Sequence, residues 1–208
     1  MKGSLTVVAF FVAGCLLSWT LSTRGVTIDI DVSRYVLYLL MLQVGLSIGS
    51  DKNIIQVLKS IRPKLLLVPL ATIIGTLSFT AIAAFFISKW SIFDCLAIGS
   101  GFAYYSLSSI LITELKTASL GVQLATELGT IALIANIIRE IMTLIGAPVF
   151  VKFFGRLAPI CAGGATTIDT TLPVITKYSG KDMVFIAILH GILVDLSVPF
   201  LVSFFCSL

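Results

Sequence analysis

Charged side chains are scarce in this sequence of 208 residues. Only 12% of its residues are Asp, Glu, Lys or Arg, about half of the share typical of a soluble domain. Hydrophobic residues make up 58% of the chain. Divided into spans of about 20 residues, this apolar content suffices for about five to seven membrane crossings. We therefore predict a single all-α, polytopic membrane domain over residues 1–208, with the lipid bilayer around it.

Several classes of protein lack their necessary residues here. The chain has one His and four widely separated Cys without a CxxC pair, so we expect no zinc or iron–sulfur site and no other cofactor. Its 14 basic residues are scattered singly, which argues against nucleic acid as a partner. The sequence contains neither a Walker loop nor a GxSxG elbow, so we expect neither an ATP-driven pump nor an enzyme.

The long apolar runs predict the membrane crossings. The most basic connection, residues 51–64, is expected on the cytoplasmic side by the positive-inside rule. A polar loop is expected over residues 114–127. The runs expected to cross fully as helices are residues 4–23, 35–48, 65–88, 129–151 and 182–207.

Two further runs, residues 93–113 and 157–174, are interrupted. The first has two glycines before a cluster of Ser and Tyr, and the second has Gly163, Gly164 and two prolines. Open backbone groups are tolerated at membrane depth only where protein or water satisfies them. We expect both runs to be broken, re-entrant hairpins, because this topology places one more basic residue inside than seven full crossings do. The N-terminus is then inside and the C-terminus outside.

Three polar residues interrupt the apolar run 129–151. Asn136, Arg139 and Glu140 have the spacing i, i+3, i+4, so they share one helix face. Charges at mid-bilayer are costly when they face lipid, so this face is expected to point into the protein. It is either a polar site for a substrate or an ion, or a structural ion pair of Arg139 with Glu140 or Asp169 that fixes helix packing.

Asp169 is the sharper candidate. It is a lone carboxylate within GGATTIDTTLP, a composition typical of the unwound midplane segments of secondary transporters. Open amides in such segments bind anionic groups, and carboxylates bind cations. The alternative is a helix-capping Asp on a surface loop.

Other polar residues in apolar runs are weaker candidates. His190 is either a packed hydrogen-bonding group or a proton carrier. Asp195 lies five residues later, about 140° around a helix, so the two cannot form one tight pair. Hydroxyl residues after the first break are either ligands or helix-packing contacts. The complete set of candidate substrate- or ion-binding residues is Asn136, Arg139, Glu140, Gly163, Gly164, Thr166, Thr167, Asp169, His190, Tyr105, Ser106 and Ser108.

Four strings carry a resemblance to a known family. They are SGFAYYSLSSILITE (100–114), LGTIALIANIIREI (128–141), GGATTIDTTLPVI (163–175) and the pair His190 and Gly191 before Pro199. The chain resembles the LysO family of bacterial lysine exporters over essentially its whole length. The resemblance implies export of L-lysine and its toxic analogue thialysine across the inner membrane. It also implies that Asp169 is required for transport, and that Asn136, Arg139 and Glu140 form the family's Asn-x-x-Arg-Glu motif.

The chain departs from this family in two respects. Longer members carry an additional N-terminal region of about three helices with another functional acidic residue. We expect this region to be supplied by a small separate membrane subunit or replaced by a second copy of the chain in a homodimer. Asp195 stands where an uncharged residue is expected, so the resemblance assigns it no role.

Export of a cation against a negative-inside potential costs about 2.3 kcal/mol per 100 mV, so it needs a driving ion. A carboxylate that alternately binds the lysine ammonium and a proton would couple the two fluxes, and Asp169 and Glu140 are the candidates. A proton is expected in preference to sodium. The amides from Gly163 onward, with Arg139, would hold the substrate carboxylate. The open alternatives are a non-transporting subunit of a two-chain exporter and a sodium-coupled transporter of another small solute.

Overall fold

The computed structural model describes residues 63–208 continuously, together with positions 13, 14, 16, 17, 19–21, 23, 39 and 42. The predicted spans 4–23 and 35–48, and nearly all of the basic connection 51–64, lie outside the described residues. The described part contains helices and no strands, which agrees with the all-α prediction.

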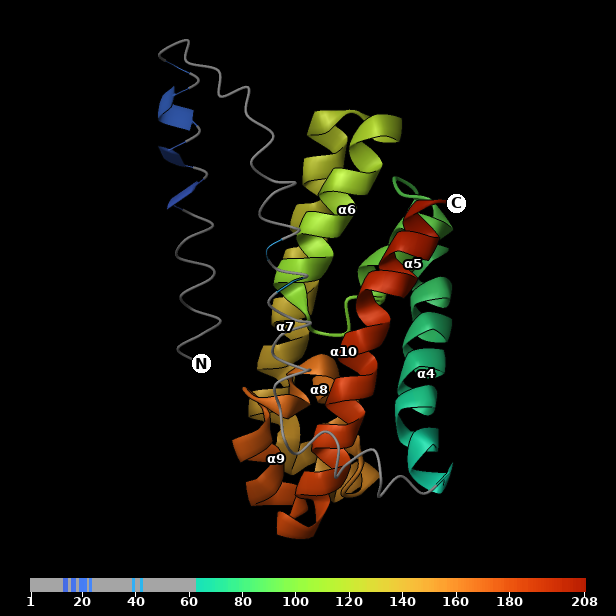
Figure 1. Ribbon diagram of the computed structural model, residues 1–208, viewed down its shortest axis with the longest axis vertical. Helices are drawn as coiled ribbons and strands as arrows, with labels where there is room; N and C mark the ends of the chain where they lie inside the picture. Colours follow the sequence, from blue (N-terminus) through green and yellow to red (C-terminus); the bar gives the residue numbers. More distant parts are fainter. Residues whose placement is uncertain are drawn as a thin grey trace.

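Three long helices form the frame of the described part. They are α4 (Leu67–Ala84), α7 (Val122–Phe154) and α10 (Val184–Cys206). Short 3₁₀ turns precede the first and the last of them, η1 (Pro63–Leu66) and η3 (Lys181–Met183). Within residues 63–208, these are the helices long and apolar enough to cross a membrane. In Figure 1, α7 and α10 run along the long axis of the described part, and α4 runs along its lower and middle part. The three helices lie on the predicted runs 65–88, 129–151 and 182–207.

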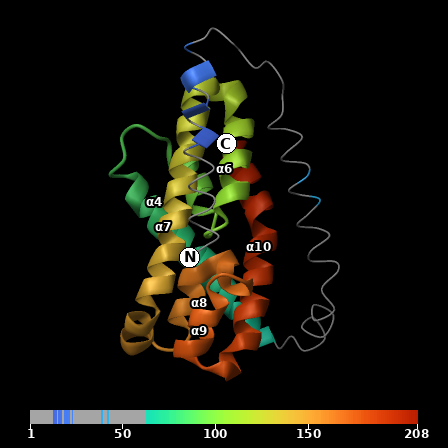
Figure 2. The same ribbon diagram turned by 90° about the vertical axis from the view of Figure 1, so that its left-hand side faces the viewer.

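The two interrupted runs are half-length helices joined by breaks. The first consists of α5 (Ile92–Gly99) and α6 (Tyr105–Leu120). The second consists of α8 (Ala158–Gly163), η2 (Gly164–Ile168) and α9 (Leu172–Ser179). In Figures 1 and 2, α5 leads inward from the end of the bundle at which α4 stops, and α6 returns to that end. The pair α8 and α9 does the same from the opposite end.

The predicted polar loop over residues 114–127 is wrong. Helix α6 continues to Leu120, Gly121 makes the turn alone with φ of 80°, and α7 begins at Val122. The polar residues of this segment did not mark a loop because their side chains find partners on neighbouring segments, on α5 and in the connection that precedes it. Lys116 pairs with Asp94, and Glu127 pairs with Lys89.

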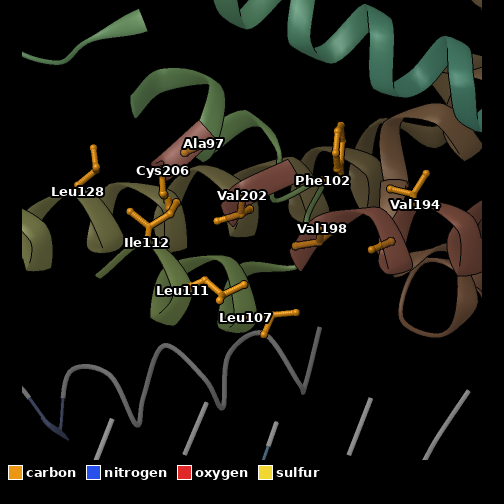
Figure 3. Packing of buried hydrophobic residues seen from close by; sticks show 12 residues of the cluster. Ala97, Phe102, Leu107, Leu111, Ile112, Leu128, Val194, Val198, Val202 and Cys206 are labelled. Carbon is orange, nitrogen blue, oxygen red and sulfur yellow. The ribbon is translucent and has the colours of Figure 1, made fainter. Parts of the chain in front are cut away.

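The main apolar core lies where α5, α6, α7 and α10 meet, and Figure 3 shows its side chains. Helices α6 and α7 approach each other closely at Gly129. A Cβ there would overlap the Thr113 hydroxyl and lie 2.8 Å from the Ser109 carbonyl oxygen. A small residue at this position therefore permits the two backbones to approach. The core residues are Ala97, Phe102, Leu107, Leu111, Ile112, Leu128, Ala132, Ala165, Val194, Val198, Val202 and Cys206.

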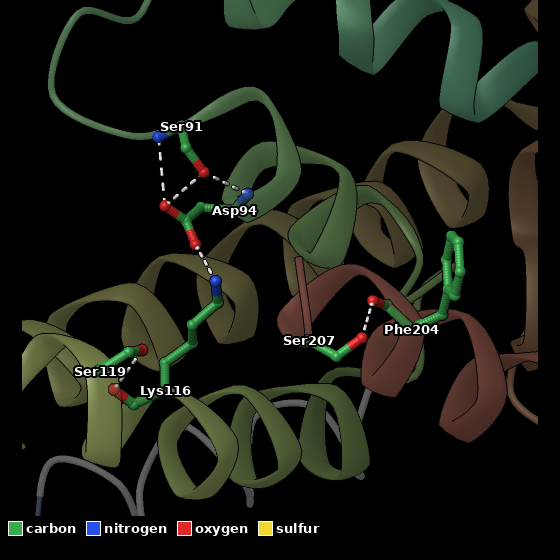
Figure 4. A network of polar contacts seen from close by, with 6 residues as sticks. All are labelled: Ser91, Asp94, Lys116, Ser119, Phe204 and Ser207. Carbon is green, nitrogen blue, oxygen red and sulfur yellow. Dashed lines mark hydrogen bonds and ion pairs between the residues drawn. The ribbon is translucent and has the colours of Figure 1, made fainter.

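A buried ion pair joins the two arms of the first broken pair (Figure 4). Lys116 Nζ on α6 lies 2.9 Å from Asp94 Oδ1 on α5, and the two side chains are 9% and 7% exposed. Asp94 also forms a capping box with Ser91. The Ser91 amide and hydroxyl donate to Asp94 Oδ2, and the Asp94 amide donates to Ser91 Oγ. One carboxylate therefore both caps α5 and fixes it against α6.

This pair allows a direct test of buried against exposed charge. Lys116→Met should lower the free energy of unfolding in detergent by about 3–5 kcal/mol, because it leaves the Asp94 carboxylate buried without its cation. Adding Asp94→Asn to this variant should recover most of the loss. The control is Lys89→Met, whose pair with Glu127 has side chains 56% and 43% exposed and should contribute less than about 1 kcal/mol. Equal losses in Lys116→Met and Lys89→Met would contradict this assignment.

Candidate functional site

The breaks of the two half-length pairs touch inside the bundle. The carbonyl oxygen of Phe102, in the first break, accepts a hydrogen bond of 2.9 Å from the amide of Ala165, in the second. Phe102 and Ala103 adopt left-handed φ angles of 43° and 73°. Such angles are unfavourable for residues with a side chain and persist only where the surroundings impose them. The contact therefore joins two irregular backbones that hold each other in place.

Gly164 makes this contact possible. Its φ is 59°, and a Cβ there would overlap the Phe102 carbonyl oxygen. Its amide donates to the Ile160 carbonyl, while the next amide serves Phe102. In this structure, the amides predicted to hold a substrate carboxylate are thus already used at Gly164 and Ala165. Gly164, which we predicted as a binding residue, is in this structure the residue through which the second break contacts the first.

Asn136 supports the first break from α7. Its Oδ1 accepts a 2.7 Å hydrogen bond from the Ala103 amide, and its Nδ2 donates to the Ala132 and Ile98 carbonyls at 2.9 and 3.3 Å. The Ser108 hydroxyl oxygen lies 3.5 Å from Asn136 Nδ2, and this hydroxyl donates to the Tyr104 carbonyl. Asn136 therefore satisfies the Ala103 amide of the break, whereas the Ser108 hydroxyl bonds to a carbonyl that already accepts the Ser108 amide within α6.

Arg139 supports the second break. Its Nε donates to the Ala162 carbonyl at 2.9 Å and its Nη2 to the Cys161 carbonyl at 3.0 Å, which are open acceptors at the C-terminal end of α8. Its Nη1 lies 3.3 Å from the Thr76 hydroxyl of α4, and its Cζ lies 5.7 Å from the centre of the Phe102 ring. Neither predicted ion pair of Arg139, with Glu140 or with Asp169, is formed. The ion pairs within residues 63–208 are those of Lys89 with Glu127, Lys116 with Asp94 and Arg156 with Asp182.

Glu140 lies on the α7 face that meets both breaks. Its neighbours on that face are Asn136, one turn before it, and Thr143, whose Cγ2 is 3.5 Å from a Cβ built on Gly163. Glu140 is fully buried, and neither carboxylate oxygen has a hydrogen-bond partner among the described residues. An isolated buried carboxylate is stable only when it is neutral or meets a cation. Glu140 therefore stands out at this site as a buried carboxylate without a hydrogen-bond partner among the described residues.

Asp169 ends the second break and is exposed on the surface of the described fold. Its Oδ1 accepts a 2.5 Å hydrogen bond from the next amide, that of Thr170. The two residues before it, Thr167 and Ile168, lie against Gly191 of α10. The structure thus places the segment that leads to Asp169 beside α10 and, through the hydrogen bond of Ala165 to Phe102, beside the first break.

His190 is fully buried between hydroxyl groups. Its Nε2 lies 2.9 Å from the Thr72 hydroxyl of α4, and its Nδ1 lies 3.4 Å from the Thr167 hydroxyl of η2. Thr167 also donates to the Ala187 carbonyl at 2.8 Å. This arrangement fits a packed hydrogen-bonding group that ties α4, α10 and the second break together.

The remaining predicted residues lie at the breaks. Thr166 donates to the Gly163 carbonyl at 2.7 Å and lies 3.3 Å from the Thr171 hydroxyl, within the second break. Tyr105 and Ser106 form the first turn of α6, directly after the first break, and are half-buried.

Sequence reasoning missed Phe102, Ala103 and Asp94. No sequence signal marks a Phe or Ala with a left-handed φ, because the surroundings impose that angle. Asp94 had a signal: Ser91 precedes it by three residues, which is the spacing of a capping box.

A Cβ at Gly164 should disrupt the contact between the breaks. We expect Gly164→Ala to lower the free energy of unfolding by more than about 2 kcal/mol, from the left-handed φ and the overlap with the Phe102 carbonyl. The matched control is Gly75→Ala in α4, where a Cβ meets no atom within 4 Å and higher helix propensity should leave stability unchanged or slightly raised. Thermal unfolding of both variants in detergent measures the difference. Equal stability of the two variants would show that the contact between the breaks does not stabilise the fold.

Comparison with known proteins places this site in a family. Residues 8–206 match the family described as Lysine exporter LysO. The chain is 33% identical over 178 residues to the "Lysine exporter LysO" of Escherichia coli (strain K12), covering 85% of the chain and 56% of that relative. It is 38% identical over 126 residues to a "Putative lysine exporter" of Haemophilus influenzae (strain ATCC 51907 / DSM 11121 / KW20 / Rd), covering 61% of the chain and 60% of that relative.

These alignments span less than two thirds of the length of either relative. No solved structure gives a significant match to the chain. The family match nevertheless extends over both breaks and the polar face of α7. The chain therefore belongs to the Lysine exporter LysO family.

Proposed function

We propose that this chain is a secondary transporter that exports L-lysine, and analogues such as thialysine, across the bacterial inner membrane. The observation that carries the proposal is the contact of two broken helices beside Glu140, a buried carboxylate without a partner among the described residues. Discontinuous helices that meet near the midplane form the binding sites of many secondary transporters. The names of the relatives supply the substrate.

In the proposed topology, α4, α7 and α10 cross the membrane, and two further helices formed by residues 4–23 and 35–48 complete five crossings. The half-length pairs are re-entrant hairpins, one from each side. The end of the bundle that carries the connections after α7 and after α9 is cytoplasmic by the positive-inside rule, because most basic residues of the described part lie there. These are Lys152, Arg156, Lys177 and Lys181, against Lys89 and Lys116 toward the opposite end. The C-terminus is then outside.

Coupling follows from the difference between the two carboxylates. Asp169 is accessible, and we assign to it the binding of the lysine ammonium. Glu140 is fully buried and without a partner among the described residues. A buried acid is stable in its neutral form, which favours a proton over sodium as the coupling ion. Both carboxylates lie beside the same pair of breaks. Binding of lysine at Asp169 therefore affects the backbone near Glu140, and binding of a proton at Glu140 affects the backbone that carries Asp169.

A second candidate is a two-chain exporter in which this chain shares its site with a small membrane subunit or a second copy. The observation in its favour is the exposure of Asp169 on the described fold, since a carboxylate at membrane depth is not stable against lipid. A partner helix over this face would shield it.

Efflux of labelled lysine tests the proposal. Cells that lack their own lysine exporter should lose labelled lysine when they express this chain, alone or together with a candidate partner subunit. Asp169→Asn should reduce the rate at least about tenfold, since the loss of a charge-assisted bond to the ammonium corresponds to about 1.4 kcal/mol or more. The control is Asp182→Asn, because Asp182 pairs with Arg156 at the bundle end, away from the breaks.

Normal efflux in Asp169→Asn would overturn the assignment of the carboxylate. Absence of lysine efflux from the unchanged protein in the membrane, with and without a partner, would overturn lysine as the substrate. Efflux that follows an imposed sodium gradient and ignores a pH gradient would overturn proton coupling.

A further inference from the structure

Helix α10 passes directly against the second break. At Gly191 a Cβ would lie 2.5 Å from both Ile168 Cγ1 and Thr167 Oγ1. The helix can therefore approach the second break this closely only because residue 191 has no side chain. Asp195 lies one turn further along α10, on the same helix face as Gly191. Asp169 directly follows Ile168 on the other side of this contact. The packing therefore places Asp169 and Asp195 close to the same contact between α10 and the second break.

The first break adds an aromatic hydroxyl to this region. Tyr104 is the residue before α6 and directly follows Phe102 and Ala103, and Phe102 is bonded to Ala165 of the second break. Residues from both breaks and from α10 therefore converge on one place in the fold.

The described residues provide no cation for this acidic pair. The ion pairs of residues 63–208 include neither Asp169 nor Asp195, and Arg139 is bound to the carbonyls of α8. A further polar atom beside Asp169, the buried hydroxyl oxygen of Thr170, has no hydrogen-bond partner in this part of the chain. Two like charges in apolar surroundings are unfavourable unless a cation or a proton lies between them. The region, as far as the structure describes it, thus has acceptors for a cationic group and lacks that group.

We propose that Asp195 is a specificity-determining residue that, with Asp169, binds the side-chain ammonium of the substrate, while the Tyr104 phenol lines one side. The inference rests on the proposed export of lysine and adds a residue to that site. An ammonium group has three donors, so it can bond to both carboxylates and the phenol oxygen at once. A substrate with a neutral side chain would leave both carboxylates without a cation, which is a strong basis for rejection. Asp195 thereby selects amino acids that carry a positive side chain.

The test compares lysine with Nε-acetyl-lysine, which keeps the α-amino acid group and lacks the side-chain charge. In vesicles containing the full chain, Asp195→Asn should raise KM for lysine about tenfold while the maximal rate changes less than about twofold. The preference for lysine over Nε-acetyl-lysine as a competitor should fall by a similar factor. Asp195→Glu should restore that preference because it restores the charge. Asp182→Asn is the control for loss of an acidic residue at the bundle end, and it should change neither value.

The outcomes separate this inference from the proposed function. If the unchanged protein does not transport lysine, the proposed function fails. If it does, and Asp195→Asn keeps both the KM and the preference, the role of Asp195 is overturned while the exporter assignment stands. If Asp195→Asn does not reach the membrane, Asp195→Glu decides: a changed KM with preserved preference supports the proposal, and an unchanged KM overturns it, because the longer side chain moves the carboxylate.

Discussion

The fold depends on one hydrogen bond between two irregular backbones, from the Ala165 amide to the Phe102 carbonyl. Backbone groups away from helices must find partners within the protein at membrane depth, because the bilayer core offers none. The first break supplies the carbonyl acceptor, and the second supplies the amide donor. Gly164 permits the approach, and the left-handed angles of Phe102 and Ala103 aim the carbonyl at it. The half-length helices are held in the bundle through this contact.

The polar residues of α7 divide into those that build the breaks and those left available for chemistry. The Asn136 amide oxygen accepts from the Ala103 amide in the first break, and Arg139 donates to two carbonyls of α8, beside the second break. Glu140, on the same helix, has no partner within the described part. A single Asn-x-x-Arg-Glu string therefore combines two structural supports with one unsatisfied carboxylate. Because all three residues are on one helix, we expect a movement of either break to change the surroundings of Glu140.

Charge at the ends of the bundle has a different role. The pair of Lys116 and Asp94 is buried and fixes α5 against α6, whereas Lys89 and Glu127 form an exposed pair. Exposed pairs contribute little to stability, and a buried pair is costly to break. The first broken pair is thus fastened at one end by charge and at its break by backbone hydrogen bonds. Its position beside α10 is thereby defined at two points.

The sequence by itself determined the helical class, the two interruptions and the shared face of Asn136, Arg139 and Glu140, because composition, glycine content and helical spacing are local properties. It did not determine the helices over residues 114–127, where polar side chains suggested a loop and tertiary partners made them helical. Only the tertiary structure decided that the two breaks touch, that Arg139 donates to carbonyls of α8, and that α10 passes the second break at Gly191. These depend on contacts between residues far apart in the chain, which no local pattern encodes.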